Sequence, residues 1–156
     1  MGDTVSSGFC VVALDNPKTI ANVGAIMRLA MNYGVALVVT SGLRYHHART
    51  DTPKGVRHIP LLTRLEDVFD ALPFDCVPVA VDLVPGARSL VDYTHPKRAF
   101  YVFGAEDATL GERVLSRCSD VVFVPTDRCM NLAVTVGVVL YDRMAKSRHG
   151  PEKEPI

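Results

Sequence analysis

One segment organises this sequence: Val121-Val-Phe-Val-Pro-Thr-Asp-Arg-Cys-Met-Asn-Leu-Ala-Val-Thr-Val-Gly-Val-Val-Leu-Tyr-Asp-Arg143. Its first four residues, 121–124, are apolar and Pro125 follows them, a pattern that predicts a buried strand ending at a turn. A run of mostly polar residues then extends to Asn131. Because ligands of open α/β sheets bind just outside the carboxyl ends of the strands, this polar turn is a candidate binding site.

The long apolar element that begins at Leu132 fits either a strand or a helix on local grounds. Its many valines favour a strand, whereas its length favours a helix. Charged residues up to Arg148 and the following Gly150-Pro151 are typical of a helix end, so we predict a helix. A helix that is apolar nearly all round must be buried on every side. Packing against a second subunit and a central position in a monomer both satisfy this requirement.

Length and composition set the class of protein. The chain has 156 residues, of which 48% are hydrophobic, and we expect one domain over residues 1–150 with a loose tail at 151–156. The formal net charge is zero, so any binding to nucleic acid would need a local basic patch. Neither a membrane-spanning apolar run nor a signal-peptide pattern is present, and we expect a cytoplasmic protein. The cysteines lack C-x-x-C spacing and are expected to be reduced thiols that bind no metal.

The first third of the chain predicts a parallel βαβ unit. Residues 9–14 form a continuous apolar run, typical of a strand covered on both faces, and residues 36–40 form a second one. Between them, residues 21–33 have helical periodicity, with Asn22 expected to cap the first turn and Gly34 the last. The apolar stripe of this helix comprises Val23, Ile26, Met27, Ala30 and Met31.

The rest of the chain continues the alternation. We predict a short helix over residues 63–72 that opens with a capping box, and another over 112–118. Residues 76–82 and 99–103 are predicted strands, and Pro78 favours a position for the first near an edge or a bulge. This pattern predicts a single-domain α/β fold, a mostly parallel sheet with helices on both faces.

Three polar clusters, each just after an apolar run, are the candidate sites. The chain has no G-x-G-x-x-G after its first strand, no phosphate-binding P-loop and no G-x-S-x-G nucleophile elbow. The clusters are Asn22-Val-Gly-Ala-Ile-Met-Arg28, Phe103-Gly-Ala-Glu-Asp-Ala-Thr-Leu110 and Val124-Pro-Thr-Asp-Arg-Cys-Met-Asn-Leu132. In this order they resemble the three motifs of the SpoU/TrmH branch of the SPOUT RNA methyltransferases, and the chain is similar to its small, single-domain, TrmL-like members. The resemblance covers the chain from about Phe9 to Arg143.

This resemblance implies a fold and an activity that the patterns themselves do not give. It implies a deep trefoil knot in the C-terminal half, a homodimer, and S-adenosylmethionine as the methyl donor. The implied reaction is 2′-O-methylation of a ribose in RNA, with tRNA expected because no added RNA-binding domain is seen. Two alternatives stay open: a non-catalytic RNA-binding homologue that keeps the fold, and a base-methylating enzyme of the same superfamily.

The resemblance also implies residue roles. Arg28 would engage the 2′-hydroxyl and the adjacent phosphate. Since arginine stays protonated, we expect it to act as a bidentate clamp and not as a general base. The residues expected to position it are Asn22, Glu106 and Asn131. Those expected to surround the cofactor are Val81, Gly104, Val124 and Cys129, and the last stands where the family commonly has serine. In the long polar loop 42–60, the expected RNA contacts are Arg44, His46, Arg49, Lys54 and Arg57.

Overall fold

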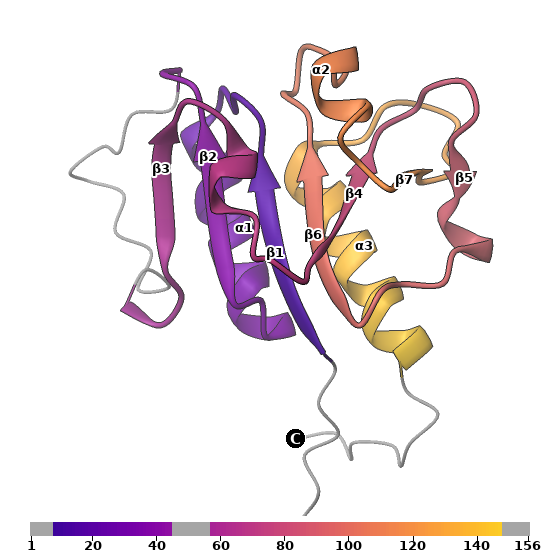
Figure 1. Cartoon of the computed structure of the whole chain (residues 1–156), viewed down its shortest axis with the longest axis horizontal. Coiled ribbons are helices and arrows are strands. Elements are labelled where there is room, and N and C mark those ends of the chain that lie inside the picture. The colour runs from indigo at the N-terminus through magenta and orange to yellow at the C-terminus, as the bar shows by residue number, and fades with distance from the viewer. Residues whose placement is uncertain (1–7, 45–56, 148–156) are drawn as a thin grey trace, which may run out of the picture.

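A parallel β-sheet forms the centre of the molecule (Figure 1). The computed structural model describes residues 8–44 and 57–147. Within them, a seven-stranded sheet has the order β3-β2-β1-β6-β4-β7-β5, and every neighbouring pair is parallel. The strands are β1 (Phe9–Leu14), β2 (Leu37–Ser41), β3 (Leu61–Leu65), β4 (Val77–Val81), β5 (Arg88–Ser89), β6 (Arg98–Phe103) and β7 (Asp120–Phe123).

Helices cover both faces of this sheet. The helical elements are α1 (Ile20–Tyr33), η2 (Val68–Ala71), η3 (Leu90–Asp92), α2 (Glu112–Leu115) and α3 (Leu132–Ser147). In β1, Val12 and Leu14 pack into the core shared with α1 and α3, whereas Val11 and Ala13 pack into the core shared with η2 and α2. Figure 1 shows α1 and α3 behind the sheet, and η2 and α2 in front of it. The predicted α/β fold with helices on both faces is confirmed.

Helix α1 forms as predicted, with one difference in its apolar stripe and one at its N-terminal cap. Four of the five stripe residues are buried, but Met31 is 37% exposed. Gly34 ends the helix as predicted, with a left-handed φ of 66° that glycine adopts without strain. The prediction that Asn22 caps the first turn is wrong, because the cap residue is Thr19 and Asn22 lies inside the helix. Its side chain is thereby free to bond elsewhere.

The helix predicted over residues 63–72 is wrong in its first half. Leu61–Leu65 instead form β3, which pairs in parallel with β2. Pairing with β2 prevails over the local capping pattern, since sheet hydrogen bonds satisfy the backbone that a lone helical turn would leave unpaired. The helical turn begins later, in η2, where the Asp67 carboxylate accepts a hydrogen bond from the Phe69 N–H at 2.9 Å.

The position near an edge or a bulge predicted for the strand with Pro78 is also wrong, because β4 lies between β6 and β7 and its register with both is continuous. The Pro78 carbonyl accepts a hydrogen bond from the Ser119 N–H at 2.8 Å. Residue pairing between β4 and β7 begins one position later, at Val79 and Asp120. The missing N–H of the proline therefore falls just before the ladder starts, where no donor is needed.

The last element is a helix, as predicted, but it is not buried on every side. Within the single chain, Leu132, Val136 and Leu140 are buried, whereas Val134 is 53% and Tyr141 57% exposed. Among the described residues, no helix is long and apolar enough to cross a membrane.

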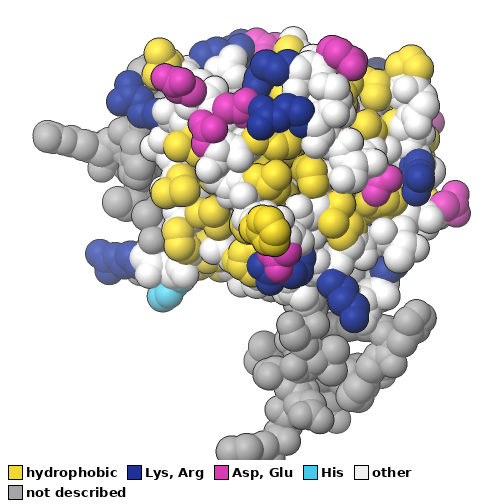
Figure 2. All heavy atoms as spheres, in the orientation of Figure 1, with side chains coloured by type: hydrophobic (Ala, Val, Ile, Leu, Met, Phe, Trp, Pro, Cys, Tyr) yellow, Lys and Arg dark blue, Asp and Glu magenta, His cyan; other side chains and the backbone are white. Residues whose placement is uncertain are grey.

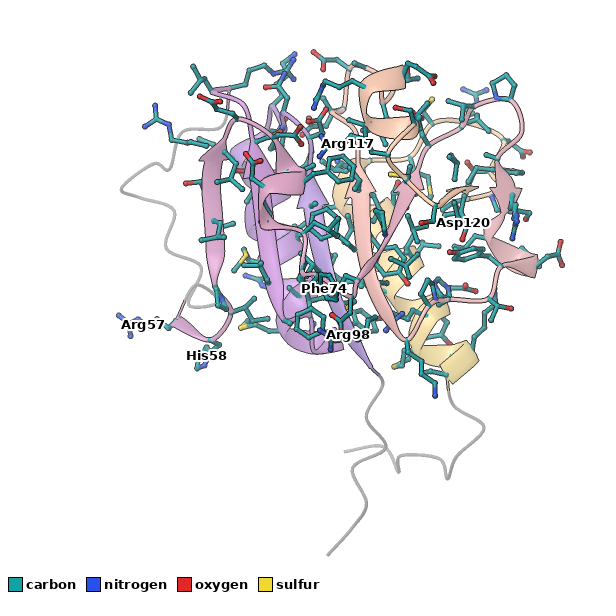
Figure 3. The ribbon with its side chains drawn as sticks, viewed as in Figure 1. Arg57, His58, Phe74, Arg98, Arg117 and Asp120 are labelled. Atoms are coloured by element: carbon teal, nitrogen blue, oxygen red, sulfur yellow. The ribbon has the colours of Figure 1, made fainter. Side chains whose placement is uncertain are left out.

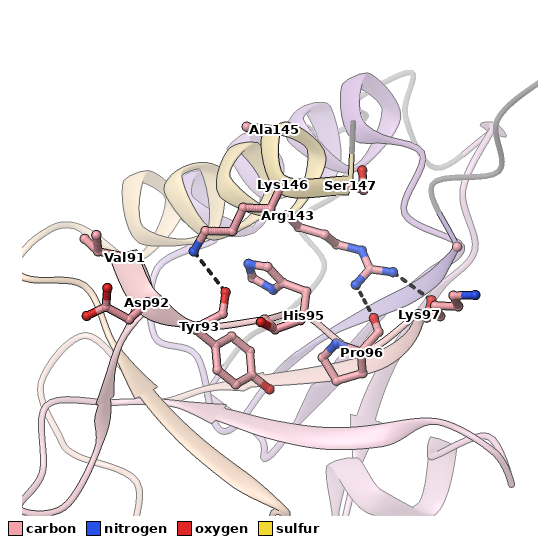
Figure 4. Close-up of a pocket in the computed structure, with 12 residues that line it drawn as sticks. Val91, Asp92, Tyr93, His95, Pro96, Lys97, Arg143, Ala145, Lys146 and Ser147 are labelled. Atoms are coloured by element: carbon pink, nitrogen blue, oxygen red, sulfur yellow. Dashed lines mark hydrogen bonds between the residues drawn. The ribbon is translucent and has the colours of Figure 1, made fainter. Parts of the chain in front are cut away.

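Two cations hold the C-terminal end of α3 against the amino-terminal end of the sheet, away from the carboxyl ends of the strands (Figure 4). Arg143, only 5% exposed, donates to the carbonyls of Pro96 and Lys97 and to the Tyr101 hydroxyl. Lys146 donates to the Tyr93 carbonyl at 3.0 Å. These bonds satisfy the cations and hold α3 against the start of β6.

A buried histidine completes this fastening. His95 Nδ1 lies 2.6 Å from the Tyr101 hydroxyl, and its Nε2 lies 2.8 Å from the Asp142 carboxylate. The Tyr101 oxygen already accepts a hydrogen bond from Arg143, so its own proton points to His95 Nδ1. We infer that Nε2 carries the imidazole proton and that His95 is neutral. Burial lowers the pKa of His95, although the Asp142 carboxylate works in the opposite direction.

Because the pKa of His95 is lowered in the folded protein, we expect the free energy of unfolding to fall in mild acid. The folded pKa lies below the ordinary 6.5, so the unfolded chain binds more protons in that interval. The contribution of His95 to the free energy of unfolding is complete above pH 6.5 and falls as the pH drops towards the folded pKa. Denaturant unfolding at pH 5–8 should show this slope in the wild type and in His58→Gln, which alters an exposed histidine. It should flatten in His95→Gln, and an unchanged slope there would contradict the inference.

Candidate functional site

The three polar clusters meet at one edge of the sheet. Because the strands are parallel, the ends of β1, β6, β4 and β7 lie together at the top of Figure 1. Asn22 lies in the first turn of α1, which follows β1. Glu106 follows β6, and Asn131 lies between β7 and α3.

The Glu106 carboxylate is held by three donors. Its Oε2 accepts from the backbone N–H of Lys18 at 3.0 Å, and its Oε1 from that of Thr19 at 3.2 Å. Asn22 Nδ2 donates to Oε1 at 2.7 Å. Burial by itself would raise the pKa of Glu106, but the hydrogen bonds from Asn22 and from the backbone hold it below its usual range. The side chain is therefore an ionised carboxylate near neutral pH.

Asn22 and Asn131 extend this contact into a chain of hydrogen bonds. Asn131 Nδ2 donates to Asn22 Oδ1 at 2.9 Å. Asn131 Oδ1 accepts from the N–H groups of Ala133 and Val134 at 2.9 and 3.2 Å, so the same side chain caps α3. Since Glu106 can only accept, the direction of every bond in the chain is fixed. The structure thus joins Glu106, Asn22 and Asn131, three of the four residues predicted to be catalytic.

Arg28, the fourth, is not joined to them. It lies six residues after Asn22 on α1, roughly 9 Å further along the helix axis. Its side chain is exposed and makes no hydrogen bond or ion pair with any residue in the part of the chain that is described.

The residues predicted to surround a cofactor follow adjacent strands. Val81 ends β4 and is 7% exposed, and Gly104 and Val124 directly follow β6 and β7. Cys129 is exposed in the turn before Asn131. A Cβ atom on Gly104 would lie 3.2 Å from the Ala108 carbonyl oxygen, so a larger residue would crowd the loop after β6.

Sequence reasoning missed one carboxylate at this edge. Asp82, directly after β4, accepts from the Leu110 N–H at 2.6 Å and from the Leu83 N–H at 2.8 Å. The backbone amides of Lys18 and Thr19 were missed as well. A polar residue directly after an apolar strand was the one available signal for Asp82.

The predicted RNA contacts are only partly described. Arg44 is exposed and its guanidinium binds both carboxylate oxygens of Asp107, at 3.3 and 3.0 Å. The long polar loop 42–60, called the basic loop below, thus begins beside Asp107, the residue after Glu106. Figure 3 shows Arg57 near the start of β3, at the end of the sheet opposite to the carboxyl ends of the strands. The other predicted contacts, His46, Arg49 and Lys54, lie outside the described residues.

The face shown in Figure 2 carries mixed charges, with cations interspersed among carboxylates. Asp67 binds both Arg113 and Arg117, at 3.2 and 2.6 Å. Arg113 also binds Asp15 at 3.2 Å. Within residues 8–44 and 57–147, no group of histidine, cysteine or acidic side chains could hold a metal ion.

Solved RNA methyltransferases share this fold. An AdoMet-bound rRNA methyltransferase from Sinorhizobium meliloti is 22% identical, with a TM-score of 0.77 over 88% of this chain and 56% of that one. The A. aeolicus TrmH/SpoU tRNA modifying enzyme is 18% identical, with a TM-score of 0.77 over 91% and 78%. A structure solved for the 2-OH methylation of C/U34 on tRNA is 23% identical, with a TM-score of 0.76 over 90% and 97%. The chain thus spans little more than half of the first relative.

The fold is therefore that of these RNA methyltransferase structures. The sequence profile of the SpoU rRNA Methylase family matches residues 10–141, and the chain belongs to this family. The resemblance stated from the sequence motifs is confirmed. The trefoil knot that it implies stays a prediction. No match is found among curated proteins.

Proposed function

We propose that this protein transfers a methyl group from S-adenosylmethionine to a ribose 2′-hydroxyl in RNA, with tRNA as the substrate. The observation that carries the proposal is the hydrogen-bonded chain Glu106–Asn22–Asn131 at the carboxyl edge of the sheet. It lies beside the strand ends that the family resemblance assigns to the cofactor, and its members come from all three motifs.

The edge of the sheet suits the proposed cofactor. Val81 offers a buried apolar wall, and Gly104, which has no Cβ, lets the loop after β6 fold closely beside it. An apolar slot with a few backbone donors and acceptors is the usual way to hold an adenosyl group. S-adenosylmethionine would supply a methyl group bound to a sulfonium: the 2′-oxygen takes the methyl carbon in line as its bond to sulfur breaks, and the neutral thioether is the leaving group. What the protein must supply is alignment and help in removing the hydroxyl proton, which needs no metal ion.

Calorimetric titration with S-adenosylmethionine tests the cofactor directly. We expect about one site per chain in the wild type. Asn131→Ala removes the cap of α3 and the bond to Asn22, which costs about 1 kcal/mol of helix stability and unsettles the turn that holds Cys129. Binding should therefore weaken in this variant and persist in Ser147→Ala, at the other end of α3. No binding to the wild type up to millimolar ligand would contradict the proposal.

Two observations support a tRNA ribose as the acceptor of the methyl group: one of the similar solved structures and the chemistry of Arg28. The tRNA methylation structure is almost entirely spanned by this chain, which favours tRNA over an rRNA acceptor. A guanidinium can bind a ribose oxygen and its neighbouring phosphate at once, which is the role we propose for Arg28. Ribose-methylated dinucleotides resist alkaline hydrolysis, so product analysis distinguishes this reaction from base methylation.

The basic loop is proposed to bind RNA phosphates. Arg44, beside the site, and Arg57, near the start of β3, are the first and last arginines of the loop 42–60. The double charge reversal Arg44→Glu with Arg57→Glu should weaken tRNA binding and flatten its salt dependence. Each lost phosphate contact lowers the slope of log K against log salt by roughly 0.7–0.9. Arg88→Glu, on the edge strand β5, is the matched control, and unchanged binding in the double variant would remove the loop from the interface.

We also propose a cytoplasmic homodimer. The exposed apolar side chains Met31 of α1, and Val134 and Tyr141 of α3, lie on the helical layer behind the sheet. A second copy packed on this layer would cover them. Sedimentation at the mass of one chain would contradict the dimer.

A further inference from the structure

We propose that Asp82 is a positioning residue for the cofactor slot proposed beside Val81, Gly104 and Val124. It would set the width of this slot by holding together the two ends, or neck, of the loop 104–110 after β6. This inference rests on the function proposed above. It begins with a carboxylate at the end of a central strand that neither the motifs nor the predicted roles include. Both of its oxygens accept from backbone N–H groups, Oδ2 from Leu110 at 2.6 Å and Oδ1 from Leu83 at 2.8 Å.

The loop 104–110 folds back on itself, and Asp82 binds where its ends approach. A Cβ on Gly104 would lie 3.4 Å from the Leu110 nitrogen and 3.2 Å from the Ala108 oxygen, so the two ends are nearly in contact. Leu110 is buried, at 3% exposed, and its N–H has little access to water. Without the Asp82 carboxylate, this buried donor would lose its partner.

The same residue joins the neighbouring strand. The Asp82 backbone N–H donates to the Val122 carbonyl of β7 at 2.9 Å. One residue thus ties the end of β4 to β7 through its backbone and to the loop after β6 through its side chain. The proposed walls of the slot lie beside these contacts: Val81 precedes Asp82, Val124 lies two residues after Val122, and Gly104 packs against Leu110.

The loop is therefore held at two points with separate functions. Its tip carries Glu106, which binds the N–H groups of Lys18 and Thr19 and the Asn22 amide. Its neck is held by Asp82. Loss of the tip contact should impair the reaction, whereas loss of the neck contact should loosen the slot and weaken binding of the cofactor.

The test is calorimetric titration of the full chain with S-adenosylmethionine, together with amide exchange of Leu110. Asp82→Asn keeps the size of the side chain but replaces one acceptor by a donor. We expect the Kd to rise about tenfold and the Leu110 N–H to exchange faster, because the one remaining oxygen can make only a neutral bond, whereas the carboxylate accepts two charge-assisted bonds. Asp92→Asn, an exposed aspartate in η3, is the matched control and should bind as the wild type does.

Each outcome bears on the proposal. Wild-type affinity and unchanged exchange in Asp82→Asn would overturn it while leaving the proposed function intact. Absence of binding to the wild type would overturn the proposed function and this role with it. If Asp82→Asn does not fold, Asp82→Ser, which keeps one acceptor of shorter reach, is titrated instead, with the same tenfold loss expected. A loss in thermal stability without loss of affinity would assign Asp82 to folding alone and overturn the positioning role.

Discussion

Replacement of Glu106 by glutamine is expected to lower kcat for RNA methylation by roughly 10²–10³-fold, the usual cost of removing one precisely placed polar group from a site. The carboxylate accepts from three donors, one on Asn22 and two on the backbone at Lys18 and Thr19. A glutamine amide would direct its NH₂ group at one of these donors, which would push the side chain out of the chain of hydrogen bonds.

The affinity for S-adenosylmethionine should change little in Glu106→Gln, because the proposed slot lies at the ends of β4, β6 and β7 and its neck is untouched. Glu112→Gln, at the start of α2, is the matched control and should keep full activity. The pKa of Glu106 is held below its usual range, so its carboxylate stays ionised through mild acid. A loss of wild-type activity between pH 8 and 5 would then come from another group. Near-normal turnover in Glu106→Gln would contradict the role.

Replacement of Arg28 by lysine is expected to lower kcat about a hundredfold while leaving the thermal midpoint of the protein unchanged. Lysine keeps the charge but cannot bind two oxygens in one plane, so a clamp on the 2′-hydroxyl and phosphate would be lost. The side chain is exposed and has no partner among the described residues, so no contact of the folded chain is broken.

A lowered kcat with an unchanged thermal midpoint would separate a role of Arg28 in the reaction from a role in folding. Single-turnover methylation of tRNA would be compared in the wild type, Arg28→Lys and Arg88→Lys, which alters an exposed arginine of β5. If Arg28→Lys turned over at nearly the wild-type rate, a bidentate clamp would be wrong, and a simple positive charge would be enough.

Elements that depend on a single continuous pattern were predictable from the sequence. The apolar run Phe9–Leu14 requires burial on both faces, and the structure buries it between two helical layers. The final helix followed from its length and its stop signal. The motifs also predicted that Asn22, Glu106 and Asn131 belong to one site, and the structure brings these three side chains together.

Elements that depend on distant partners were not predictable. Leu61–Leu65 form a strand because β2 is available beside them, and Thr63 in isolation resembles a helix start. Asn22 resembles a helix cap until Glu106, 84 residues away, takes its amide. The position of Asp82 after an apolar strand marked it only weakly, and its partner could not be predicted because that partner is a backbone N–H, which every residue except proline carries.

The Asn131 side chain makes two kinds of hydrogen bond at once. Its oxygen starts a sixteen-residue helix and its nitrogen orients Asn22. Aspartate could serve the first purpose but has no N–H₂ for the second, and serine is too short to reach both. Under the proposed role of Asn131, selection for folding alone would tolerate other helix-capping residues at this position, whereas selection for methylation would keep asparagine. In a mutational library scored separately for abundance and for methylation, Asp and Ser should survive the first screen and vanish from the second.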